Sequence, residues 1–194
     1  MLFRSQLEAI AAHFTPAAAK TGLLYSPAII REVALFFRRN PSIPLVIDPV
    51  MVATSGRRLL QIEGIEALKK QLLPLAAIVT PNLAEAEILI GRKIHSLTQL
   101  REAARTIYRA FGCAALVKGG HLPGTGEAVD FFHGQEGEWM LSSPRVANVA
   151  LHGAGCTYSA AITAWLARGK SPLRSVVLAK NYITRKIYET RFSS

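Results

Sequence analysis

The turn Gly153-Ala154-Gly155-Cys156 contains the residue types with the clearest chemical potential in this chain. Glycine on both sides of Ala154 lets the backbone bend and approach an anion closely, because no Cβ atom is in the way. The alanine-rich segment that follows predicts a helix whose N-terminal amides and positive dipole end point at the turn. The turn is therefore predicted to hold the charge of a transferring phosphoryl group. The alternative is a tight turn that begins a packed helix.

Cys156 lies at the predicted N-terminus of that helix, where free amides and the helix dipole should lower the pKa of a thiol. A thiolate there could accept the proton of an attacking substrate hydroxyl. The alternative is a buried cysteine that packs as a small hydrophobe, and this is the role that the sequence suggests for Cys113. Two cysteines predict no disulfide framework, and no Cys/His spacing fits a zinc site.

Polar residues end several short apolar runs that predict buried strands: Lys20, Asp48, Thr80 and Lys118. In open α/β sheets the ligand lies at the carboxyl ends of the strands, so we expect these side chains at one site. Lys118 could neutralise ATP phosphates, and Asp48 could bind a metal or a phosphate-linked water. The alternatives are a solvated lysine before a loop and an aspartate that caps a turn. His121 is expected to be a loop residue.

The segment Asn82-Leu83-Ala84-Glu85 begins a predicted helix. Asparagine at the N-cap with glutamate at the third helical position is close to a capping box, which is the structural alternative. The functional hypothesis is that Glu85 orders Mg²⁺ or its waters near ATP phosphates. The position just beyond Thr80, on the presumed ligand edge of the sheet, favours the functional hypothesis.

Helices and strands are predicted to alternate along the chain. Helical patterns cover residues 6–14, 27–39, 64–73, 82–90, 97–111, 155–168 and 172–189. Apolar runs predict strands at residues 17–22, 44–48, 76–80 and 114–118. Residues 128–132 and 138–141 flank a turn-like segment and predict an antiparallel hairpin at the sheet edge. This pattern predicts one α/β domain over residues 1–194, a mostly parallel sheet covered by helices on both faces.

The composition limits the classes of partner. The net charge of +10 suits an anionic ligand, but basic doublets such as Arg38-Arg39 are scattered, so no nucleic-acid partner is expected. Half of the residues are hydrophobic, which predicts a folded chain. No apolar stretch is long enough to span a membrane, and no signal peptide is apparent. The expected compartment is a reducing cytoplasm.

Five motifs in order resemble the hydroxymethylpyrimidine/phosphomethylpyrimidine kinases of thiamine biosynthesis. They are KTGLL at 20–24, VIDPVM at 46–51 with TSG at 54–56 and LL at 59–60, TPNLAEA at 80–86, VKGGH at 117–121 and HGAGCT at 152–157. The similarity extends from about residue 5 to about residue 185. It implies a ribokinase-like fold and an enzyme that uses ATP and Mg²⁺ to phosphorylate 4-amino-5-hydroxymethyl-2-methylpyrimidine and then its monophosphate.

The resemblance also implies roles for individual residues. Cys156 would be the catalytic base, and Gly153, Ala154 and Gly155 would form the anion hole. Asp48 and Glu85 would surround Mg²⁺ and the phosphates. Thr80, Asn82 and Lys118 would contact ATP. Val50 and Gly22 would contact the pyrimidine.

This chain departs from the family pattern in two places. Ala154 replaces a threonine found in many relatives, a change that keeps the backbone amides. The glycine-rich strand and turn with which family members begin is absent, and the end after Phe192 looks shortened, so the first strands of the family fold are expected to be missing. A gene fragment or mis-set start, a degenerate pseudo-kinase, and a partner that supplies the strands are the open explanations. The alternative functions are pyridoxal-kinase-like activity and that of an inactive nucleotide-binding module. Whether the chain forms a homodimer is left open.

Overall fold

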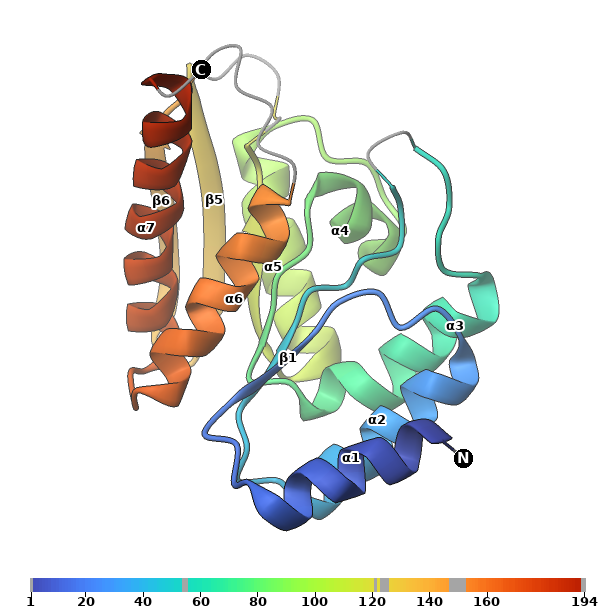
Figure 1. Ribbon diagram of the computed structural model, residues 1–194. Coiled ribbons are helices and arrows are strands. Elements are labelled where there is room, and N and C mark those ends of the chain that lie inside the picture. The colour runs from blue at the N-terminus through green and yellow to red at the C-terminus, as the bar shows by residue number, and fades with distance from the viewer. Residues whose placement is uncertain (1, 54–55, 121, 123–125, 147–152, 193–194) are drawn as a thin grey trace.

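A six-stranded sheet forms the centre of the computed structural model, which describes residues 2–53, 56–120, 122, 126–146 and 153–192 (Figure 1). The strands are β1 (Ala19–Thr21), β2 (Leu45–Ile47), β3 (Ile78–Val79), β4 (Ala114–Lys118), β5 (Glu127–Gly134) and β6 (Gly137–Pro144). They lie side by side in chain order. Strands β1 to β4 are parallel, whereas β5 and β6 run antiparallel to their neighbours. The predicted mostly parallel sheet with an edge hairpin is confirmed.

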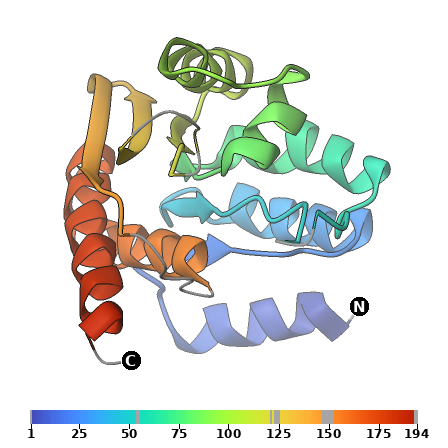
Figure 2. The ribbon, with the colours of Figure 1, turned by 90° about the horizontal axis from the view of Figure 1, so that it is seen from above.

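Helices cover both faces of this sheet, as Figures 1 and 2 show. The helices are α1 (Leu2–His13), α2 (Pro27–Arg39), α3 (Ile62–Ala67), α4 (Leu83–Ile90), α5 (Leu97–Phe111), α6 (Ala154–Ala167) and α7 (Pro172–Phe192). Helices α2 to α5 share one hydrophobic core with the sheet, and α6 and α7 share the other. Helix α1 contacts α2 and buries none of its own residues. No helix among the described residues is long and apolar enough to cross a membrane.

The local sequence explains where these helices begin and end. The Ser26 hydroxyl accepts a hydrogen bond from the Ile29 amide at 3.3 Å, and Pro27 fits the first turn because it has no N–H to leave unpaired. Helix α5 ends at Gly112, whose left-handed backbone (φ 73°) suits glycine.

The helix predicted at residues 64–73 is present, but its type changes along its length. The α-helical part ends at Ala67, a π-helical turn follows at Leu68–Leu72, and a 3₁₀ turn covers Leu73–Leu75. Pro74 is the physical reason, because its ring clashes with the carbonyl four residues earlier and it cannot donate a backbone hydrogen bond.

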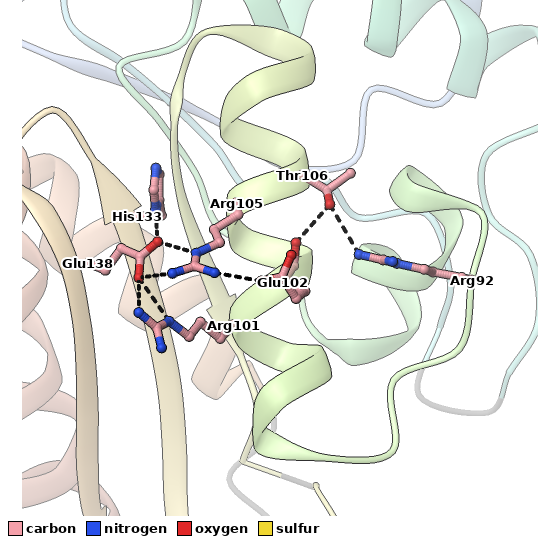
Figure 3. A network of polar contacts seen from close by, with 7 residues as sticks. All are labelled: Arg92, Arg101, Glu102, Arg105, Thr106, His133 and Glu138. Atoms are coloured by element: carbon pink, nitrogen blue, oxygen red, sulfur yellow. Dashed lines mark hydrogen bonds and ion pairs between the residues drawn. The ribbon is translucent and has the colours of Figure 1, made fainter.

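The β5–β6 hairpin is longer and tighter than the sequence predicted. Gly134 pairs with Gly137, so the connecting loop has two residues instead of the expected turn over 133–137. Gly137 adopts φ 96°, a backbone conformation open to glycine, and this permits the tight turn. Figure 3 shows how Glu138 ties the hairpin to α5: its carboxylate pairs with Arg101 and Arg105 and lies 3.0 Å from the His133 ring.

The cross-strand partners Phe132 and Trp139 lie on the same face of the hairpin but differ in burial, and this difference can be tested. Phe132 is fully buried against α6 and α7, whereas Trp139 is 51% exposed. Replacement of Phe132 by alanine should lower the free energy of unfolding by about 3–5 kcal/mol, because it leaves a cavity. The matched Trp139→Ala variant should lose less than about 1 kcal/mol. Urea unfolding measures both, and equal losses would contradict the difference in burial between these two positions.

Candidate active site

The polar residues at the strand ends lie on the face of the sheet that α6 and α7 cover. Side chains alternate between faces along a strand, so residues two apart share a face. Ala18, Val46, Ile78 and Leu116 pack into the core beneath α6 and α7. Two residues beyond each of them stand Lys20, Asp48, Thr80 and Lys118. The expectation that these side chains gather at the carboxyl edge of the sheet is confirmed by the contacts below.

Asp48 is the meeting point of this group. Its side chain is 3% exposed, and the Lys118 ammonium nitrogen lies 3.2 Å from its Oδ1 atom. The Ser159 hydroxyl from α6 lies 3.2 Å from Oδ2 and 3.0 Å from the Cys156 carbonyl oxygen, so its single proton serves one of them at a time. The Thr80 hydroxyl lies 3.5 Å from the Asp48 Oδ1 atom. One carboxylate therefore joins β2, β4 and α6.

The N-terminus of α6 has the form that the sequence predicted for an anion site. Gly153 is the N-cap residue with φ 79°, and a Cβ atom there would meet nothing within 4 Å. Helix geometry leaves the first N–H groups without intrahelical partners, and the N-cap residue Gly153 has no side chain to cap them. Gly155 lies close to a cation, since a Cβ on it would be 3.2 Å from the Lys118 ammonium nitrogen. Free amides, a dipole end and an ammonium group thus converge here.

The expected lowering of the Cys156 thiol pKa is wrong. Burial raises this pKa above its ordinary value, and interaction with the Asp48 carboxylate raises it further, while Lys20 and Lys118 oppose the shift. Desolvation and the Asp48 carboxylate both disfavour the charged thiolate. Cys113 is buried before β4, and burial raises its pKa to about 12, which agrees with a packing role.

Glu85 forms the capping box that was the structural alternative. Its carboxylate accepts a hydrogen bond from the Asn82 amide at 2.8 Å, and the Asn82 side-chain oxygen accepts from the Glu85 amide at 2.9 Å. Burial raises the Glu85 pKa to about 7, the Asn82 hydrogen bond and Lys118 lower it, and the Asp48 charge raises it. Glu85 therefore caps α4 beside the backbone bridge between Asn82 and Lys118, and its role toward a metal stays a prediction.

The donor set fits Mg²⁺ better than a metal that needs a protein cage. The described residues contain no cluster of three or more His, Cys, Asp and Glu side chains that could hold a metal. Mg²⁺ is commonly bound through one or two carboxylates together with waters and phosphates. Asp48 and Glu85 could supply those carboxylates.

The other predicted site residues lie at the same edge of the sheet. Gly22 and Val50 follow β1 and β2, and the Val50 amide donates to the Asp48 carbonyl at 2.8 Å. Thr80 is buried, and its hydroxyl reaches the site only beneath Asp48. Asn82 pairs with Lys118 through an isolated bridge, with its side chain used as the helix cap. His121, His152 and the Thr54-Ser55 part of the second motif lie outside the described residues.

Sequence reasoning missed Ser159 and a second buried ion pair. Ser159 is fully buried one helical turn after Cys156, a spacing that could have indicated it. Asp130 on β5 and Lys180 on α7 are buried and lie 2.8 Å apart. The position of Lys180 on the apolar face of α7 could have indicated that it is buried, because Val176 and Ile183 are its neighbours on that face.

Comparison with known proteins settles the family. A family model described as phosphomethylpyrimidine kinase matches residues 1–193. The chain belongs to this kinase family. It is 40% identical over 188 residues to a hydroxymethylpyrimidine/phosphomethylpyrimidine kinase of Haemophilus influenzae, an alignment with 95% of this chain and 70% of that protein. It is 38% identical to the thiamine biosynthesis bifunctional protein ThiED of Geobacter sulfurreducens, of whose length the chain spans 37%.

Solved structures of the kinase family have the same fold. The phosphomethylpyrimidine kinase of Clostridium difficile superposes with a TM-score of 0.82 at 38% identity, covering 95% of this chain and 74% of that one. The pyridoxal kinase of Staphylococcus aureus in complex with ADP gives 0.85 at 34% identity, covering 94% and 66%. The predicted ribokinase-like fold and the predicted family are confirmed.

The raised pKa of Glu85 predicts a pH dependence of stability. Between the unfolded value of 4.5 and the folded value of about 7, the folded protein keeps a proton that the unfolded chain has released. The free energy of unfolding should therefore fall as pH rises through this window, by roughly 2–4 kcal/mol from this group. Glu85→Gln removes the titration and keeps an acceptor for the Asn82 amide.

Urea unfolding of both proteins between pH 4 and 8, without divalent cations, should show the variant gaining stability over the wild type as pH rises. Parallel pH curves would show that Glu85 has an ordinary pKa.

Proposed function

We propose that this chain carries out, or is part of an enzyme that carries out, the phosphorylation of 4-amino-5-hydroxymethyl-2-methylpyrimidine and its monophosphate from ATP, in thiamine diphosphate biosynthesis. The observation that carries the proposal is the convergence of the uncapped α6 N-terminus, Cys156 and Lys118 around Asp48, in a member of the phosphomethylpyrimidine kinase family. The names of the curated relatives support the substrate and the pathway.

In this mechanism the protein positions charge around the transferring phosphoryl group. The amides of Gly153, Ala154 and Gly155 donate to its equatorial oxygens, and Lys118 neutralises part of its charge. Cys156 accepts the proton of the attacking hydroxymethyl oxygen. Because its thiol pKa is raised in the free protein, the reactive thiolate is a minor form that becomes more abundant as pH rises.

The remaining residues would hold the substrates in place. Asp48 and Glu85 would hold Mg²⁺, which when bound would offset charge on the ATP phosphates. Thr80 supports Asp48 from beneath, and Asn82 would approach ATP from the start of α4. Gly22 and Val50 would border the pyrimidine. Use of ATP is supported by family relatives solved with ADP and with the ATP analogue AMP-PCP. A cytoplasmic location and a homodimer stay predictions.

Pyridoxal kinase activity is the second candidate. The structural similarity to pyridoxal kinases, with a TM-score of 0.85 for the Staphylococcus aureus protein, is the observation that favours it. The discriminating assay offers hydroxymethylpyrimidine and pyridoxal separately with MgATP. Phosphorylation of pyridoxal alone would replace the first proposal by the second. ADP binding without turnover of either compound would favour an inactive nucleotide-binding module.

Replacement of Cys156 by alanine tests the assigned base. We expect kcat to fall by roughly 10²–10⁴-fold, because the proton of the attacking hydroxyl loses its acceptor. The matched control is Cys113→Ala, which removes the buried thiol far from the strand ends and should leave kcat within about twofold. Steady-state kinetics on hydroxymethylpyrimidine measures both variants. Full activity in Cys156→Ala would remove the cysteine from the mechanism.

A further inference from the structure

The buried pair Asp130–Lys180 lies next to Lys118 of the candidate site. Asp130 is the cross-strand partner of Lys118 in the antiparallel β4–β5 ladder. Directly opposed residues of such a ladder present their side chains on the same face, close to each other. Burial raises the pKa of the Asp130 carboxyl, and Lys180 and Lys118 oppose this shift. Lys118 therefore has two carboxylate neighbours, those of Asp48 and Asp130.

The Lys180 ammonium group forms an ion pair with the Asp130 carboxylate. Its nitrogen donates to Asp130 Oδ2 at 2.8 Å and to the Ala128 carbonyl at 2.9 Å. The other carboxylate oxygen, Oδ1, accepts from the Gly119 amide at 3.2 Å. The side chains of Asp130 and Lys180 are 5% and 8% exposed. The Tyr158 hydroxyl faces the same carboxylate from α6 without completing a hydrogen bond among the described residues.

Stability alone is a weak reason for such a pair. Removal of two charges from water is costly, and well-packed apolar residues often replace a buried ion pair without loss of stability. A role in positioning the neighbouring charged groups explains the buried Asp130–Lys180 pair better than stability does. The turn that follows Lys118 is held tightly to β5, since a Cβ atom on Gly119 would lie 2.4 Å from the Val129 carbonyl oxygen.

We propose that Lys180 is a positioning residue: it neutralises and holds Asp130, so that Lys118 is left to face Asp48 and the N-terminus of α6. Lys118 then has a 3.2 Å contact with Asp48 and lies close to Gly155. Without Lys180, the uncompensated Asp130 carboxylate would draw the Lys118 ammonium to itself and away from the phosphates. The effect on nucleotide affinity rests on the proposed function, whereas the effect on the position of Lys118 does not.

The test compares Lys180→Met with the double variant Lys180→Met/Asp130→Asn. The matched control is Lys186→Met, the same substitution at an exposed lysine of α7 that pairs with Glu189. Crystal structures without nucleotide report the partner of Lys118. Calorimetric titration with MgADP reports affinity. If Lys180→Met does not fold, Lys180→Gln takes its place, because its amide can still donate to Asp130 and Ala128.

In the single variant we expect Lys118 to be bonded to Asp130 and the Kd for MgADP to rise roughly tenfold or more. The double variant should return Lys118 to Asp48 and recover the wild-type Kd, because the competing carboxylate is gone. Lys118 unchanged on Asp48 in the single variant, or an affinity that the double variant does not recover, would overturn the proposal. If the wild type binds no MgADP, the proposed function fails, and the position of Lys118 still supports or overturns the role of Lys180.

Discussion

The contact between the Asp48 carboxylate and the Lys118 ammonium group organises the rest of the site. A buried carboxylate is costly without partners, and Asp48 obtains them from β4 and α6, which are distant in the chain. The pairing fixes Lys118 over the sheet edge and places the first turn of α6 beside it. The helix amides and the ammonium group can then act on one anion. Under the proposed function, that anion is the transferring phosphate.

The same carboxylate also sets the state of its neighbours. Burial raises the pKa of Cys156 and of Glu85, and the Asp48 charge adds to both shifts, so both groups hold protons more strongly than usual in the free protein. A site with the Asp48 carboxyl group, two nearby lysines, Lys20 and Lys118, and helix N-terminal amides suits a highly charged ligand. Arrival of phosphate and Mg²⁺ would change this balance. The protonation of Cys156 and Glu85 in the free protein would therefore change when a ligand binds.

Much of this arrangement could be predicted from the sequence because it depends on residues that are close together in the chain. An apolar run followed by one polar residue marks a strand end, and the glycines before Cys156 mark a helix N-terminus. The capping box of Asn82 and Glu85 is also a local pattern. The Cys156 pKa could not be predicted this way, because it depends on a carboxylate from another strand. The Asp130–Lys180 pair needs the β5 register and the docking of α7, and the widened turn after Ala67 depends on how Pro74 is accommodated.

The pKa of the Cys156 thiol tests most directly whether Asp48 governs the site. It can be measured from the pH dependence of iodoacetamide alkylation, without divalent cations and in a Cys113→Ala background, in the wild-type site and in Asp48→Asn. The account predicts a pKa above the ordinary value of 9.0 in the wild-type site and a clear decrease when the carboxylate becomes an amide. A thiol pKa at or below the ordinary value, or one unchanged in Asp48→Asn with the fold intact, would contradict it.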